Sequence, residues 1–147
     1  CLKFANYLAK NHGKTLYLTN EENVTRVKTK LNLLNESISN NFLINFDSKS
    51  IEDIFRNVAK YKPQFVIIDS MQNIGIDYKE LSYLRSKFPQ IGVTAINYST
   101  KGGEVRGKQD KEYQGDCTIV FEKRGIATTK KNRFGEAGKH FVLFKEK

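Results

Sequence analysis

An apolar run that ends in a carboxylate is the part of this sequence most able to do chemistry. Residues 65–68 read Phe-Val-Ile-Ile, and Asp69 and Ser70 follow directly. Such a run predicts a strand buried on both faces, as in parallel sheets, whose carboxyl ends are where ligands bind. At that position Asp69 could hold the water shell of a Mg²⁺ ion, with Ser70 helping to orient water. The alternative is a strand-ending Asp that caps the following turn.

Two adjacent carboxylates follow a second short apolar segment. Thr15 to Leu18 predicts a strand, and Glu21 and Glu22 come in the turn after it. Hydrolysis of a phosphate anhydride needs a base that polarises the attacking water, which either glutamate could supply. The alternative is that both only favour the start of the following helix through its dipole.

The elements that must position these residues alternate along the chain. Apolar spacing predicts helices over 2–9, 24–34, 51–58 and 81–88, and strands over 15–18, 42–46, 65–69 and 93–96. Asp47, Ser48 or Ser50 could cap the third helix. This alternation implies βαβ crossovers and an α/β fold with a mostly parallel central sheet flanked by helices.

The last third of the chain has a different texture. Residues 98–114 are polar and rich in Gly, Lys and Glu, which predicts a mobile loop. Three β-like segments follow, and they predict a C-terminal antiparallel β meander attached to the parallel sheet. These segments are 117–121, 126–130 and 140–144.

Composition limits the function classes. The 147 residues suit one domain, and 39% hydrophobic content is enough for a core. The formal net charge of +9 favours a polyanionic partner such as nucleic acid or nucleotide phosphate. Cys1 and Cys117 form no spaced cluster, so neither a zinc site nor a disulfide scaffold is indicated. No stretch has membrane-spanning length and no secretory pattern occurs, which predicts a soluble cytoplasmic protein.

Four segments, in order and with similar spacings, resemble the bacterial RadA (Sms) family of DNA recombination and repair ATPases. Residues 15–23 are similar to that family's strand running into a Gly-Glu-Glu-Ser turn, and 68–72 to its Asp-Ser-Ile-Gln segment. Residues 99–102 resemble its Thr-Lys-containing loop, and Gly107 and Asp116 fall where the family has Gly and Asp. Residues 131–135, Lys-Asn-Arg-Phe-Gly, complete the set. The resemblance implies a single RecA-like ATPase domain over residues 1–147.

The resemblance also implies a site for ATP and Mg²⁺ at subunit interfaces. Asp69 would hold the ion through water, with Ser70 beside it. Glu21 would be the better candidate for the base, and Glu22 would project toward the neighbouring helix. Asn97, after the fourth strand, would sense the γ-phosphate, although Asn is equally common as a turn residue.

Two basic residues of the Lys-Asn-Arg-Phe-Gly motif have an implied role between subunits. Lys131 and Arg133 lie one residue apart, so both would face the same side of a strand. In related hexameric ATPases such residues reach the γ-phosphate held by a neighbouring subunit. That role requires a homo-oligomer, as a hexameric ring or a filament. The alternative is a solvated basic end of a hairpin.

The polar loop has an implied role in binding single-stranded DNA. In RecA-type rings the equivalent loop faces the central channel, and here it carries Lys101, Arg106, Lys108 and Lys111. Contacts from these side chains to the DNA backbone would be sensitive to salt and independent of sequence. The alternative is a solvated linker. The resemblance further suggests a RecA-type recombinase as a partner.

Departures from the family pattern leave other functions open. No Gly-x-x-x-x-Gly-Lys-Ser/Thr phosphate loop (Walker A) occurs in the 147 residues, and the spacing suggests that the chain is cut inside that motif. The family's zinc module, its Lon-like domain and the loop His expected at Asn97 or Tyr98 are also absent. The alternatives are a non-catalytic DNA- or partner-binding module of the same fold, and an ATPase similar to KaiC or to replicative helicases.

Overall fold

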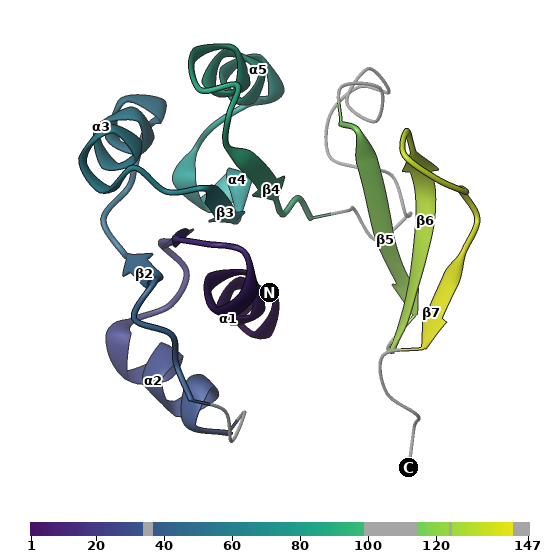
Figure 1. The fold of residues 1–147 in the computed structure, drawn as a ribbon, viewed down its shortest axis with the longest axis horizontal. Coiled ribbons are helices and arrows are strands. Elements are labelled where there is room, and N and C mark those ends of the chain that lie inside the picture. Colours follow the sequence, from purple (N-terminus) through teal and green to yellow (C-terminus); the bar gives the residue numbers. More distant parts are fainter. Residues whose placement is uncertain (34–36, 99–114, 124, 143–147) are drawn as a thin grey trace. The chain divides into compact units, whose positions relative to one another are not determined.

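The computed structural model describes residues 1–33, 37–98, 115–123 and 125–142. The elements fall into two compact units, Cys1–Tyr98 and Ser99–Lys147 (Figure 1). The expected mobile loop lies almost entirely outside the described residues. We describe each unit by itself.

The first unit is a parallel α/β sheet. Its elements in chain order are α1 (Leu2–Asn11), β1 (Thr15–Thr19), α2 (Val24–Leu33), β2 (Phe42–Asn45), α3 (Ile51–Tyr61), β3 (Phe65–Asp69), α4 (Met71–Ile74), α5 (Tyr78–Lys87) and β4 (Gly92–Ala95). The strands lie in the order β2-β1-β3-β4, and every neighbouring pair is parallel. The predicted fold class is confirmed. Helix α4 was not predicted, because four residues are too few to show a helical period.

Helices cover both faces of this sheet (Figure 1). On one face, side chains such as Tyr17 and Ile67 pack in a cluster with α1 and α2. On the other face, Leu16, Val66 and Ile68 pack with α3, α4 and Leu84 of α5. Successive residues of a strand point to opposite faces, so a strand buried on both sides must be apolar throughout. This explains the uninterrupted run in β3.

Local signals place the helix ends of α3. Ser50 is its N-cap, and its hydroxyl accepts a hydrogen bond of 3.3 Å from the Asp53 N–H. Ser50 is thus the actual cap among the three expected candidates. At the other end Lys62 takes a left-handed conformation with φ of 47°, and Pro63 follows. Strand β3 can therefore start at Phe65 and reach the sheet edge at Asp69.

The strand order creates a topological switch point between β1 and β3. From β1 the chain passes through α2 to β2 on one side, and it then returns through α3 to β3 on the other side of β1. Because α2, which follows β1, packs on one face and α4 and α5, which follow β3, pack on the other, the loops after β1 and β3 diverge, and this is where ligands bind in open α/β sheets. In the register of these strands Thr19 pairs with Asp69. We call residues 19–21 and 69–70 the switch-point edge.

The second unit is an antiparallel meander. It consists of β5 (Cys117–Lys123), β6 (Ile126–Asn132) and β7 (His140–Val142), in the order β5-β6-β7. The predicted meander is confirmed. Its expected attachment to the parallel sheet is not found among the described strands, which form two separate sheets. The backbone groups of β5 pair with β6, with two register shifts along the ladder.

Candidate functional site

Asp69 is fixed at the switch-point edge from inside the sheet. It ends β3 with a half-buried side chain, and Ser70 after it is fully buried. The Tyr17 hydroxyl, which comes from the neighbouring strand β1, donates a hydrogen bond to Asp69 Oδ2. The structure thus brings the predicted carboxylate to the carboxyl end of β3, adjacent to the end of β1.

Glu21 lies at the same edge and joins three segments of the first unit. Its Oε2 accepts a hydrogen bond of 3.2 Å from Asn73 Nδ2 on α4. It also accepts a hydrogen bond from the hydroxyl of Tyr98, which follows β4. The charge of Asp69 also contributes to raising the pKa of Tyr98. A carboxylate on the loop after β1 is therefore close to the one that ends β3.

Glu22 is directed elsewhere. Its carboxylate forms an ion pair with Lys30 of α2, and its side chain is 19% exposed. Two adjacent glutamates therefore have different environments, one at the switch-point edge and one against α2. This geometry separates the two candidates for a base that the sequence left open.

Both tyrosines at this edge are held in the protonated, donating form. Burial is the main cause that raises the pKa of Tyr17 far above its ordinary value, and the hydrogen bond to Asp69 adds to it. The hydrogen bond to Glu21 is the main cause that raises the pKa of Tyr98 to about 12. Neither phenol loses its proton near neutral pH.

Buried oxygen atoms without hydrogen-bond partners gather near this edge. Among the described residues they are Thr19 Oγ1, Asn20 Oδ1, Ser70 Oγ and Gln72 Oε1. A buried polar atom without a partner costs about 1–3 kcal/mol, so such atoms are rare away from functional sites. Thr19 ends β1, Asn20 and Ser70 directly follow β1 and β3, and Gln72 lies at the start of α4, where a bound ligand or water could satisfy them.

The donor set fits Mg²⁺ bound together with phosphates. Mg²⁺ usually keeps several waters and takes one or two carboxylates plus phosphate oxygens. Asp69 supplies one carboxylate, and the unpartnered Ser70 and Thr19 hydroxyls lie beside it. No group of three His, Cys, Asp or Glu side chains suited to a metal occurs in the described part of the chain. The edge therefore suits an ion that arrives with a nucleotide, not a protein-only metal cage.

The other predicted residues are placed differently. Asn97 lies after β4, but its Nδ2 donates to the Tyr78 hydroxyl of α5 and not to Asp69 or Glu21. Lys131 and Arg133 belong to the second unit, at the end of β6 and just beyond it. The four expected DNA-binding residues of the loop lie outside the described residues.

The Lys-Asn-Arg-Phe-Gly motif covers the end of β6 and the turn that follows it. Asn132 Oδ1 accepts a hydrogen bond of 3.1 Å from the Phe134 N–H, and the Phe134 ring is 86% exposed. The Arg133 guanidinium forms an ion pair of 3.2 Å with Asp116. Asp116 is itself one of the positions that carried the resemblance, so the motif and this Asp are one local structure.

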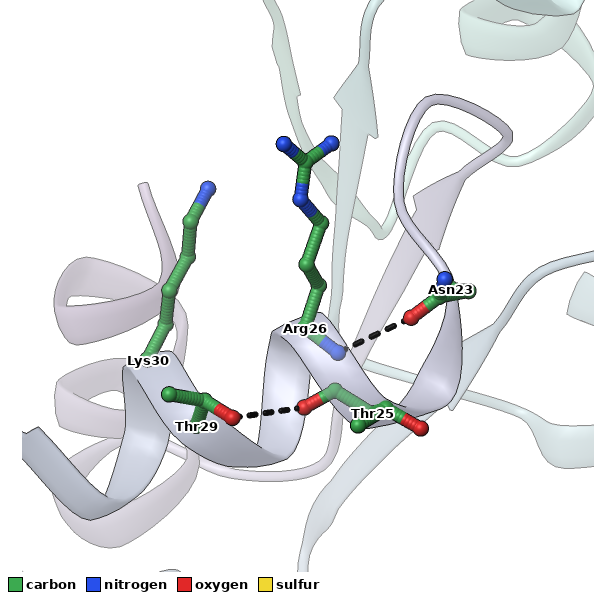
Figure 2. Close-up of a pocket in the computed structure, with 5 residues that line it drawn as sticks. All are labelled: Asn23, Thr25, Arg26, Thr29 and Lys30. Carbon is green, nitrogen blue, oxygen red and sulfur yellow. Dashed lines mark hydrogen bonds between the residues drawn. The ribbon is translucent and has the colours of Figure 1, made fainter.

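A surface depression on α2 is lined by Asn23, Thr25, Arg26, Thr29 and Lys30 (Figure 2). Figure 2 shows Arg26 and Lys30 projecting from the same side of the helix. Asn23 Oδ1 accepts a hydrogen bond of 2.9 Å from the Arg26 N–H, which is typical of a helix start. Lys30 is paired with Glu22. These contacts explain the depression as the surface of a capped helix.

Sequence reasoning missed three contacts of the site, namely those of Tyr17, Asn73 and Tyr98. In the sequence, Tyr17 is one residue of an apolar strand, and Asn73 lies on α4, which was not predicted. Tyr98 stands out only as a position where the related family is expected to carry a His. The sequence feature that could have indicated the role of Tyr17 is its polar hydroxyl group within a strand that is otherwise fully buried.

Comparisons with known proteins agree with this architecture. No family model matches the chain. Curated relatives named DNA repair protein RadA come from Chlamydia pneumoniae, Aquifex aeolicus and Campylobacter jejuni, at 29%, 26% and 29% identity over 97%, 90% and 91% of this chain. The chain spans about a third of the length of these relatives. A solved KaiC-like protein from Pyrococcus horikoshii is 17% identical with a TM-score of 0.60, covering 94% of this chain and 74% of its own.

These findings define the fold class of the chain. The parallel sheet flanked by helices, with an antiparallel meander, is the RecA-like α/β fold. The resemblance to the RadA family that the motifs indicated is confirmed over nearly the whole chain. Within the described residues, no helix is long and apolar enough to span a membrane.

The Tyr98–Glu21 hydrogen bond predicts a delayed ionisation of one tyrosine. The difference between the ultraviolet pH titrations of the wild-type protein and Tyr98→Phe isolates Tyr98 among the seven tyrosines. We expect its midpoint near 12, and a return toward 10 in Glu21→Gln, because the hydrogen bond to the Glu21 carboxylate is the main cause of the raised pKa. The stabilisation from this bond should be present below about pH 10 and lost as pH rises through 12. A wild-type midpoint near 10 would contradict the contact.

Proposed function

We propose that this chain is the core of an ATP-dependent DNA repair ATPase that binds ATP and Mg²⁺ at its switch-point edge. The observation that carries the proposal is the convergence of Asp69 and Glu21 at the topological switch point of a parallel sheet. The similarity to DNA repair proteins named RadA supports the DNA-repair part. The phosphate loop that such a site also needs is not among these 147 residues.

Asp69 and Ser70 have the roles of ion holder and water orienter in this proposal. When bound, Mg²⁺ would offset the charge of the nucleotide phosphates. Asp69 would accept hydrogen bonds from the water around the ion, as a single half-buried carboxylate can. The buried Ser70 hydroxyl, which has no partner among the described residues, would complete that shell.

Glu21 has the role of the general base. Its carboxylate is exposed, and the groups that donate to it among the described residues are neutral, Asn73 and Tyr98. No cation is paired with it among these contacts, so it keeps the capacity to accept a proton from an attacking water. Asn97 would sense the γ-phosphate after leaving Tyr78, its present partner.

Adjacent isosteric substitutions test this assignment. In the natural protein at full length, Glu21→Gln should lower kcat for ATP hydrolysis by about 10²–10³, because a positioned base contributes that much. ATP binding should be retained. Glu22→Gln is the matched control, since it removes the same charge from a side chain directed at α2, and it should change kcat by less than about threefold.

Three results would change the proposal. Equal effects of the two substitutions would remove Glu21 from the role of base. ATP binding without hydrolysis in the full-length wild type would favour the non-catalytic module. Strand displacement coupled to hydrolysis would favour the helicase-like alternative.

Lys131 and Arg133 act between subunits in this proposal. Arg133 is paired with Asp116 across an exposed contact, with side chains 56% and 34% exposed. Exposed ion pairs contribute about 0–1 kcal/mol, so this pair can exchange for a phosphate at little cost. Charge supplied to a phosphate by a neighbouring subunit requires a homo-oligomer, and a ring or filament provides it.

Mixing two inactive variants tests action between subunits. Lys131→Ala keeps Glu21, and Glu21→Gln keeps Lys131, so a head-to-tail oligomer made from equal amounts has both groups at about a quarter of its interfaces. On mixing, we expect the ATPase activity to recover to about a quarter of the wild-type value, in line with the fraction of complete interfaces. Mixing Glu21→Gln with the Glu21→Gln/Lys131→Ala double variant is the control and should recover nothing. No recovery in the first mixture would contradict a role in trans.

Single-stranded DNA is the second ligand in this proposal, held by Lys101, Arg106, Lys108 and Lys111. Replacing all four by Ala should reduce the dependence of log Kobs on log salt by about 0.7 per lost phosphate contact. The matched control replaces Lys49, Lys60, Lys79 and Lys87, which changes the net charge equally outside the loop. Fluorescence anisotropy with an oligonucleotide at several salt concentrations measures both. Equal slopes for the two quadruple variants would contradict binding by the loop.

A further inference from the structure

Tyr17 is a buried polar residue that packing alone does not explain. It is the third residue of β1 and is 3% exposed. Its ring lies in the apolar cluster with α1 and α2, edge-on to Phe42 at 6.2 Å between centroids. A phenylalanine would fill that volume equally well. The hydroxyl is what distinguishes this residue, and its partner is Asp69.

The register of the sheet brings this hydroxyl to Asp69. Tyr17 pairs with Ile67, and Asp69 is two residues further along β3 on the same face. The long phenol side chain leans along the strand direction and spans that step. The contact therefore follows from the pairing of two strands that are buried on both faces.

The bond constrains one oxygen of Asp69. Among the described residues, the group that donates a hydrogen bond to this carboxylate is the Tyr17 hydroxyl, and it occupies Oδ2. A hydrogen bond to an ionised group is stronger than one between neutral groups, and a ring held by packing cannot follow a rotating carboxylate. Asp69 is thus held in one orientation with Oδ1 left to accept further bonds.

We propose that Tyr17 is a positioning residue, which orients the Asp69 carboxylate so that its second oxygen can accept from metal-bound water. This inference rests on the proposed function of Asp69. It adds a residue with no ligand contact of its own, on the strand next to the one that carries the carboxylate. Groups that orient metal-binding carboxylates commonly contribute about 10–100-fold to metal affinity or activity.

Tyr17→Phe removes the hydroxyl and keeps the ring. In the natural protein at full length we expect kcat for ATP hydrolysis to fall about tenfold and the half-saturating Mg²⁺ concentration to rise by a similar factor. The KM for ATP should stay within about twofold, because the nucleotide is not contacted. Tyr83→Phe is the matched control. It removes a phenol from the exposed face of α5, where the ring lies against Phe55, and should leave all three values unchanged.

A second readout needs neither metal nor nucleotide. Unfolding midpoints without Mg²⁺ are compared for Tyr17→Phe, Asp69→Ala and the double variant. Because the two groups form one hydrogen bond, the double variant should lose less than the sum of the two single losses. Additive losses would overturn the inference.

The outcomes separate the inference from the proposed function. If the wild type hydrolyses ATP with Mg²⁺ but Tyr17→Phe behaves like Tyr83→Phe, the inference falls and the proposed function stands. If the full-length wild type neither binds nor hydrolyses Mg–ATP, the proposed function fails, and the positioning role fails with it even where the unfolding data show coupling. If Tyr17→Phe loses cooperative unfolding and ATP binding together, its role is purely structural and the inference is overturned. The inference is supported if Tyr17→Phe lowers kcat without changing the KM for ATP and if the losses of unfolding midpoint are non-additive.

Discussion

The parallel pairing of β1 with β3 is the constraint on which the rest of the first unit depends. It places Thr19 opposite Asp69 and makes the loops after the two strands diverge to opposite faces. It also carries the Tyr17 hydroxyl to Asp69. Because both strands are buried on both faces, a slip of one residue would put every side chain on the wrong face. Core packing therefore fixes the position of the polar edge.

Burial and function compete at this edge. Thr19 and Ser70 are as inaccessible as the core, yet their hydroxyls have no partner among the described residues. Each such atom costs about 1–3 kcal/mol in the ligand-free fold. The core clusters on both faces of the sheet must outweigh that cost. A ligand that supplied the missing bonds would recover that cost.

The fold was predictable because its signals are local and periodic. Strand β3 was predicted at its actual bounds, and the other strands and every helix except α4 to within a few residues, since apolar runs and helical spacing reflect burial directly. The positions of Asp69 and Glu21 at one edge followed from the parallel topology. Their hydrogen bonds did not, because Tyr17 and Tyr98 lie 52 and 77 residues from their partners. The meander itself was predicted, but not that its strands form a sheet of their own, since spacing shows that strands exist and not which sheet they join.

The contacts of the candidate site residues differ in burial. This difference matches how much each residue would have to move in the proposed function. Tyr17 holds Asp69 from within the core, where a bond to an ionised group resists exchange with water. Glu21 and Arg133 are held by contacts at the surface, with Tyr98 and Asp116, where water competes and each bond contributes little. A hydrolytic site needs a fixed ion holder, together with a base and a cation that can change partners during a cycle. The permanent contact of this chain is the buried one, and its exchangeable contacts lie at the surface.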